Sequence, residues 1–313
     1  MRLRILSRAS ALARLQTALV ERALRAEHPG LEIECLTRKS AGDQDQTSPL
    51  WKLPDKGAFT ADLSQALIAG DADMVVHSFK DLPIEMPAGS HIAGALPRAD
   101  ARDVVLIKQS AIDAQPDSLR ILSSSPRRGW LLGEVMPALL PWRTGTLDAI
   151  PVRGNIETRL RKRADEGHHA VVVAVAALER LGLMDQVSEV LDTAVLLPQA
   201  AQGALGVECR ADDAETAQRL SAIDDPVAHR EVRAERAFLA ELGGGCSLPC
   251  GALARDAESG EIVLDALLAS LDGNIVLRTR VMGSDAVEVG REAARDLLDG
   301  KGGRDLLDLG FVA

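Results

Sequence analysis

The chain has 313 residues, of which 46% are hydrophobic and 26% charged, and its net charge is −10. This length allows two or three domains with cores of their own, and the composition is that of an ordinary soluble globular protein. No apolar run approaches the roughly 20 residues of a membrane-spanning helix. An acidic chain with no Tyr, four Phe and three Trp also argues against nucleic-acid binding.

The four cysteines are too few and too scattered for a disulfide framework, which favours a reducing, cytoplasmic location. They are Cys35, Cys209, Cys246 and Cys250. The last two lack a second pair of ligands nearby, so no structural zinc site is expected. The arginine-rich N-terminus is interpreted as a strand followed by a helix capped by Ser10, and not as an export signal.

The first hundred residues alternate between strand-like and helix-like patterns. Strands are predicted at residues 2–7, 31–37 and 72–77. Helices are predicted at residues 10–28 and 59–69. This order predicts a mainly parallel sheet with helices on both faces. The polar stretch from Arg38 to Lys56 has no periodicity, and a loop of that length is typical of an active-site lid.

The alternation resumes after residue 100 and changes in character near Pro226. Further strands are predicted near residues 103–107, 119–124, 147–152, 169–176 and 204–209, with helices near 126–137 and 155–165. The last part is predicted to contain a helix at 227–242, strands near 250–255, 261–270 and 274–282, and a helix near 286–299. Asp272-Gly273 is a hairpin signal between two of these strands.

These patterns predict two doubly wound α/β domains and a small α+β domain at the C-terminus. The expected domains are residues 1–97 with 203–221, residues 101–197, and residues 226–313. The segment between 196 and 203 is rich in turn-forming and small residues, as expected of a crossover between domains.

The strand predicted at 72–77 is followed by a cation and a carboxylate, Lys80 and Asp81, and then by Pro83. Ligands commonly bind where the strands of an α/β sheet end, so both charges are expected to face a cleft. From this segment alone, a strand that ends in an ion pair and a turn is the simpler explanation.

Arginines follow several other predicted strands. Between Arg120 and Arg163 the chain has nine cations and three acids, which suggests an anionic ligand, although a solvated helix face explains some of them. Pro126 stands at the first position of a predicted helix, which adds free backbone N–H groups to this region. Arginines stand after three predicted strands in two adjacent domains, at Arg8, at Arg127 with Arg128, and at Arg153. Several guanidiniums in one cleft would suit a ligand with several carboxylates.

Cys246 lies in a glycine-rich turn between residues 243 and 249. A buried structural thiol is the commoner fate of a free cysteine. The alternative is an exposed nucleophile or attachment point, because glycines allow another group to approach the backbone closely. A cysteine hydrolase is not favoured, since no histidine lies in a local catalytic pattern.

Together these segments resemble the porphobilinogen deaminase family, also called hydroxymethylbilane synthases, over essentially the whole chain. The motifs that carry the resemblance occur in order: Arg8-x-Ser10, Lys56-Gly57-x-Phe59, His77-Ser78-x-Lys80-Asp81-x-Pro83, Ser124-Ser125-x-Arg127-Arg128, Arg153-Gly154-Asn155-x-x-x-Arg159, Gln202-Gly203-Ala204, Glu208-Cys209-Arg210 and Gly244-Gly245-Cys246.

The resemblance implies an enzyme that joins four porphobilinogen molecules into hydroxymethylbilane and releases ammonia from each. It also implies a dipyrromethane primer, bound covalently through a thioether to Cys246. Each porphobilinogen carries an acetate and a propionate, which agrees with the polycarboxylate that the arginines suggest. A cytoplasmic monomer that binds neither nucleic acid nor membrane is expected.

Roles for individual residues are implied by the resemblance. Asp81 matches the catalytic carboxylate, which would stabilise the positive charge that forms on the substrate. Residues matching cofactor-binding positions are Cys246, Ser78, Lys80, Asp81, Ser125, Arg127, Arg128 and Arg159. Residues matching substrate-binding positions are Arg8, Ser10, Gln16, Ser123, Arg153, Arg159 and Arg180. Lys56 and Phe59 match a lid.

The chain departs from the family pattern at a few positions. Leu122-Ser123 replaces a usual Gly-Thr pair, Pro126 and Ala177 replace other common residues, and Pro54-Asp55 replaces a Gly pair before the lid. The competing hypothesis is a two-domain solute-binding or effector-sensing protein that takes a carboxylate, because periplasmic binding proteins have similar paired α/β domains. Such a protein would need neither Cys246 on a glycine turn nor Asp81 among arginines.

Overall fold

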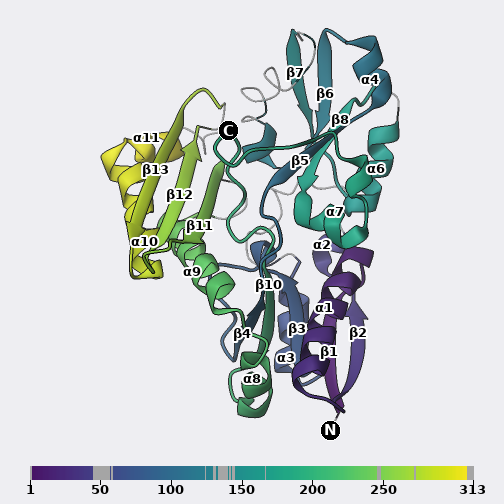
Figure 1. The fold of residues 1–313 in the computed structure, drawn as a ribbon, viewed down its shortest axis with the longest axis vertical. Coiled ribbons are helices and arrows are strands. Elements are labelled where there is room, and N and C mark those ends of the chain that lie inside the picture. The colour runs from purple at the N-terminus through teal and green to yellow at the C-terminus, as the bar shows by residue number, and fades with distance from the viewer. Residues whose placement is uncertain are drawn as a thin grey trace.

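The computed structural model describes residues 2–44, 57, 59–123, 125–129, 132, 140, 142, 145–165, 167–244, 248–270 and 273–308. Three sheets divide these residues, and Figure 1 shows one sheet at the N-terminal end, one at the opposite end of the long axis and one to the side. Within the described ranges, no helix is both long and apolar enough to cross a membrane.

The first sheet contains five strands in the order β2-β1-β3-β10-β4. Its strands are β1 (Arg2–Arg8), β2 (Glu32–Arg38), β3 (Met74–Ser78), β4 (Ser90–Leu96) and β10 (Leu205–Arg210). β1 pairs in parallel with β2 and β3, whereas β10 runs antiparallel between β3 and β4. The associated helices are α1 (Ala11–Glu27), α2 (Ala41–Gln44), α3 (Ala61–Ile68) and α8 (Ala214–Ser221).

The second sheet repeats this arrangement with the order β7-β6-β8-β5-β9. Its strands are β5 (Asp103–Ile107), β6 (Ser118–Leu122), β7 (Thr146–Ile150), β8 (Ala170–Ala174) and β9 (Glu189–Val190). The helices around it are α4 (Gln109–Ala114), α6 (Ile156–Ala164) and α7 (Val175–Leu181). β5 runs antiparallel to β8, so each of the two sheets has one reversed strand in the same relative place.

The third sheet is antiparallel, in the order β11-β12-β13. Its elements are α9 (Pro226–Glu241), β11 (Cys250–Asp256), β12 (Ile262–Ala269), β13 (Val276–Gly283), α10 (Ala286–Arg295), a π-helical turn (Asp296–Gly300) and α11 (Gly303–Asp308). α9 and α10 pack closely because Gly290 lacks a side chain: a Cβ there would overlap the carbonyl oxygen of Ala234.

The predicted fold class is confirmed by these sheets, and most predicted strands and helices end within two or three residues of those observed. The elements that were not predicted are short or have weak local patterns, and they include α2, β4, α4, α7, β9, α8 and α11. Of the helix predicted at 126–137, residues 126–129 are helical and most of the remainder lies outside the described residues. Asp272 of the predicted hairpin also lies outside them, although β12 and β13 pair as a hairpin would.

A buried cluster of hydrogen bonds around Glu208 fixes the position of β3, the strand that leads to the charged residues. Glu208 on β10 is fully buried and accepts a hydrogen bond from His77 Nε2 at 2.8 Å. The hydroxyls of Ser64 and Ser90 donate to the same carboxylate at 2.8 and 2.5 Å. These bonds join β3, β4, β10 and α3, so the C-terminal end of β3 rests on a fully hydrogen-bonded core.

Candidate active site

A single 3₁₀ turn, Phe79–Asp81, follows β3 and carries two of the predicted charges. Phe79 is buried, and its backbone N–H donates to the carbonyl of Ala204 at 3.1 Å. Lys80 and Asp81 form no direct ion pair with each other. Lys80 Nζ donates instead to Gln202 Oε1 at 3.0 Å, and the Asp81 side chain stays 29% exposed.

Asp81 faces residues that come from the N-terminal part of the chain. Its Oδ2 lies 3.9 Å from Arg8 Nη1 at the end of β1. The guanidinium of Arg8 lies over the ring of Phe59, 4.5 Å from the ring centroid, which is a cation–π contact. The structure therefore brings Arg8, Asp81 and Phe59 together, and leaves the carboxylate of Asp81 reachable from solvent.

Asp103 is the fully buried partner of the two adjacent arginines. Arg127 Nη2 donates to its Oδ2 and Arg128 Nη2 to its Oδ1, both at 2.7 Å. Burial alone would raise the pKa of this carboxyl, but Arg127 and Arg128 hold the pKa of Asp103 well below its usual range. Arg127 also donates through Nη1 to the carbonyl of Leu197 at 2.5 Å.

The side-chain amide of Gln202 connects this buried group to Lys80. Its Oε1 accepts from Lys80 Nζ at 3.0 Å and from Arg128 Nη2 at 3.3 Å. Its Nε2 donates to Asp103 Oδ1 at 2.8 Å and to the carbonyl of Ala101 at 2.7 Å. Because every one of these atoms is paired, the amide holds cations from two domains in one fixed arrangement.

Three cations of the site have lowered pKa values, and burial is the main cause in each case. Burial, with a further contribution from Arg128, lowers the pKa of Lys80 to about 8. Burial, together with Arg128 and Arg153, lowers the pKa of Arg159 to about 10. Burial likewise lowers the pKa of Arg180 to about 10. A negatively charged ligand would stabilise the charged forms of these groups and raise their pKa values.

Buried nitrogen atoms give a second sign that the site is built for a ligand. Among the described residues, the Nε atoms of Arg127, Arg128 and Arg180 are buried without a hydrogen-bond partner. Arg180 Nη2 donates to the carbonyl of Gly203 at 2.7 Å, and Arg159 Nε donates to that of Gly154 at 2.9 Å. Guanidiniums held by carbonyls retain their full positive charge toward a ligand with several carboxylates.

The predicted polar residues around these charges mainly position the backbone. Ser10 caps α1, its side chain accepting from the N–H of Ala13 at 3.2 Å. Gln16 on α1 donates to Ser78 Oγ at 2.9 Å. Ser123 Oγ accepts from the N–H of Ser125 at 3.3 Å.

The remaining contacts are local to the second domain or cross to the first. Ser125 Oγ accepts from the N–H of Arg128 at 3.4 Å, as a helix cap does. Arg153 Nη2 reaches the carbonyl of Gly42 at 3.4 Å, which joins the second domain to the first near α2. Lys56, Ser124 and Cys246 lie outside the described residues.

Two residues of the site were not assigned a role from the sequence. Gln202 stands in one of the motifs, but its amide gave no sign of its partners. Asp103 was not singled out, although an acid at the head of the apolar run 103–107 in an arginine-rich segment is a signal of a buried pair. Both lie where the chain crosses between the first two domains.

Known proteins match the chain over nearly its full length. A family model described as "Porphobilinogen deaminase, dipyromethane cofactor binding domain" matches residues 3–218, and "Porphobilinogen deaminase, C-terminal domain" matches residues 229–299. A porphobilinogen deaminase from Roseiflexus sp. (strain RS-1) is 40% identical and covers 96% of this chain and 97% of its own. One from Syntrophus aciditrophicus is 39% identical and covers 98% of both chains.

Among solved structures, similarity is weaker. A nutrient binding protein from Burkholderia cenocepacia, solved with bound methionine, covers 76% of this chain and 95% of its own. It is 13% identical, with a TM-score of 0.43. A similarity at this level carries no information about a ligand.

Proposed function

Since the chain belongs to the porphobilinogen deaminase family, we propose that its basic site holds the covalent dipyrromethane of that family and that Asp81 is the catalytic carboxylate. The chain is a transferase of tetrapyrrole biosynthesis, which condenses four porphobilinogen molecules into hydroxymethylbilane and releases ammonia. The observation that carries the site assignment is the excess of buried cations around a reachable carboxylate.

The described residues fit a dipyrromethane. The group has four carboxylates, and the site offers Lys80, Arg128 and Arg159 with pKa values or buried nitrogens that call for anionic partners. When bound, the dipyrromethane would supply the pyrrole carbon to which the first porphobilinogen is added, and each later porphobilinogen would add to the terminal ring of the growing chain. Cys246 is proposed as its attachment point, through a thioether.

Asp81 acts on the substrate through its charge. Loss of ammonia from porphobilinogen leaves a cationic pyrrole, and a carboxylate close to the pyrrole N–H stabilises that cation. Asp81 suits this role because its side chain is 29% exposed and is not engaged by Lys80, its neighbour in sequence, which donates to Gln202 instead. The same carboxylate can accept a proton as the ring returns to neutrality.

The arginines divide between direct and indirect roles. Arg127 uses both terminal nitrogens on Asp103 and Leu197, so it contributes to the cofactor site by fixing Asp103 and with it Arg128. Arg8, Arg153 and Arg180 are proposed to bind the incoming substrate. The remaining substrate-side residues are Ser10, Gln16 and Ser123, and the proposed lid consists of Lys56 and Phe59.

We further propose that the chain acts as a cytoplasmic monomer with the domain limits 1–97 plus 203–221, 101–197 and 226–313. The separate sheets support these limits, since each lies within one of the proposed domains. Free thiols at Cys35 and Cys209 support a reducing compartment.

The mass of the purified chain tests the proposed attachment. The wild type is expected to be heavier than its sequence by one covalent dipyrromethane, and Cys246→Ser is expected to lack the addition. Cys35→Ser, which removes an exposed thiol, is the control and should keep it. A wild type of unmodified mass that releases no ammonia from porphobilinogen would contradict the enzyme, and would favour a carboxylate-binding protein.

Lys80 gives the site a pH dependence with a defined sign. Its pKa of about 8 means that the free ammonium loses its proton as the pH rises through that value, and only the charged form pairs with a carboxylate. In the Cys246→Ser chain, calorimetry should therefore show porphobilinogen binding about tenfold weaker at pH 9.5 than at pH 7. Lys80→Met should bind weakly at both values.

The control for this measurement is Lys108→Met. Lys108 is half-buried and donates to the carbonyls of Ala164 and Asp165, away from the site. This variant should keep the wild-type pH profile. A profile that stays unchanged in Lys80→Met would assign the titration to another group and would argue against Lys80 as a carboxylate contact.

A further inference from the structure

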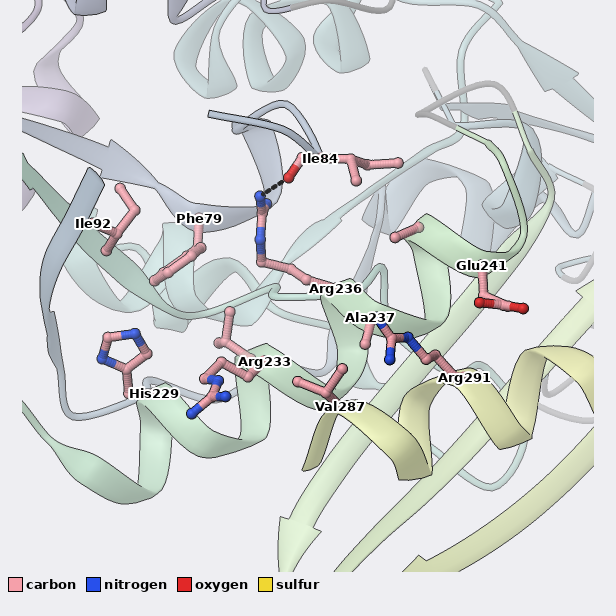
Figure 2. Close-up of a pocket in the computed structure, with 12 residues that line it drawn as sticks. Phe79, Ile84, Ile92, His229, Arg233, Arg236, Ala237, Glu241, Val287 and Arg291 are labelled. Atoms are coloured by element: carbon pink, nitrogen blue, oxygen red, sulfur yellow. Dashed lines mark hydrogen bonds between the residues drawn. The ribbon is translucent and has the colours of Figure 1, made fainter. Parts of the chain in front are cut away.

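A pocket of about 430 Å³ lies between the first and third domains (Figure 2). The first domain contributes Phe79, Ile84 and Ile92 to its lining, and α9 and α10 contribute the rest. It therefore adjoins the segment that carries Lys80 and Asp81, but from the side of the third domain. Pockets of this size accept ligands of about drug-like dimensions.

The lining of this pocket combines apolar side chains with an excess of positive charge. Phe79, Ile92 and Val287 provide apolar surface, and three arginines, Arg233, Arg236 and Arg291, stand around it. The lining also contains one acid, Glu241, and its carboxylate already accepts from Arg295 Nε at 3.2 Å.

The other titratable lining groups do not reverse this balance. His229 Nδ1 lies 3.0 Å from Asp224 Oδ1, and Arg291 lies 3.8 Å from Glu288. Asp285, at the start of α10, interacts electrostatically with Arg233 and Arg291. A molecule that is apolar at one end and anionic at the other would match both halves of the lining.

Arg236 is the arginine of the lining that is best placed to bind an anion. Its Nη2 donates to the carbonyls of Pro83 and Ile84 at 2.6 and 2.8 Å, and its guanidinium lies 5.7 Å from the centroid of the Phe79 ring. Among the described residues, no carboxylate lies within ion-pair distance of it, and burial lowers its pKa. Its other donors are left for a ligand, because one nitrogen makes both bonds.

We propose that this pocket binds a small aromatic carboxylate, with its ring against Phe79 and Ile92 and its carboxylate on Arg236. This site is separate from the one that holds the primer and goes beyond the proposed function. Arg236 also donates to the carbonyls of Pro83 and Ile84, which follow Leu82. A carboxylate that shifts this guanidinium would therefore move the backbone next to Asp81. Binding in this pocket would thus change the conformation of the turn Phe79–Asp81, which carries Asp81.

The probe is 2-naphthoate, titrated by calorimetry into the loaded enzyme without porphobilinogen, which the enzyme would consume during the titration. One naphthoate is expected to bind per chain. Arg236→Met should lower the affinity about tenfold or more, since the variant loses the charge-assisted, bidentate hydrogen bonds between the guanidinium and the carboxylate. Val287→Phe, which fills the pocket and removes no charge, should lower it as well and serves if Arg236→Met does not fold. Arg22→Met, an exposed change on α1, is the control and should bind normally.

Two further measurements separate this site from the basic cleft. The neutral 2-naphthamide should bind at least about tenfold more weakly than the acid, because it lacks the charge. Hydrogen exchange of residues 82–85 should change when naphthoate binds. The proposal is overturned if Arg236→Met and Val287→Phe both bind like the wild type, or if porphobilinogen displaces the naphthoate one for one.

Discussion

Replacing Asp81 with Asn is expected to lower the rate of porphobilinogen consumption by about 100-fold or more, while the fold and the covalent dipyrromethane stay in place. The substitution keeps the shape of the side chain and removes its negative charge. Because Asp81 is 29% exposed and its ion pair with Arg8 is 3.9 Å long, little stability depends on it. Steady-state kinetics measure the rate, intact mass shows whether the dipyrromethane is retained, and thermal unfolding shows whether the fold is retained.

Asp113→Asn is the control for that experiment. Asp113 is exposed on α4, where it accepts a hydrogen bond from Gln109, and its loss removes one negative charge far from the reaction. It should leave the rate unchanged. A near-normal rate in Asp81→Asn would refute the stabilisation of the substrate cation by this carboxylate, whatever the control shows.

Replacing Asp103 with Asn is expected to destabilise the protein by about 3–5 kcal/mol, because two buried guanidiniums lose their charged partner. Urea unfolding measures the change. Asp265→Asn is a matched control: Asp265 also pairs with two arginines, Arg255 and Arg280, but these are 47% and 69% exposed. The control should lose no more than about 1 kcal/mol.

Unfolding at acidic pH provides a second test of the pairing of Asp103 with Arg127 and Arg128, because the lowered pKa of Asp103 fixes the direction in which stability changes with pH. The pKa of Asp103 is lowered in the folded protein, so its stabilisation is complete above the ordinary carboxyl pKa and is lost as the pH falls below it. The wild type should therefore lose stability toward low pH more steeply than Asp103→Asn. Equal slopes, or a loss in urea no larger than that of Asp265→Asn, would contradict the buried pairing of Arg127 and Arg128.

Much of the fold could be predicted because several of its strands are continuous apolar runs, such as the fully buried Ala170–Ala174. β4 could not, since the segment Ser90–Leu96 contains Gly and Ala and has little strand preference of its own. It forms a strand because β10 pairs with it along its length. The short helices α4 and α8 likewise depend on packing that a local pattern does not contain.

The site could be predicted where it follows the ends of strands, as Lys80, Asp81 and Arg153 do. It could not be predicted where its geometry depends on contacts between residues far apart in the sequence. Gln202 and Asp103 are separated by 99 positions, and Lys80 and Gln202 by 122. The sequence therefore indicated which cations gather but not that one buried amide connects them.

The place of β10 has a consequence for how the chain acquires its structure during synthesis. Strands β3 and β4 of the first sheet are joined only through β10, whose residues Leu205–Arg210 come after the entire second sheet in the sequence. As the chain leaves the ribosome from its N-terminus, the second sheet can be completed while the first still has a gap between β3 and β4. Closing that gap is a late, long-range step, and the turn that carries Asp81 is anchored only when it is done.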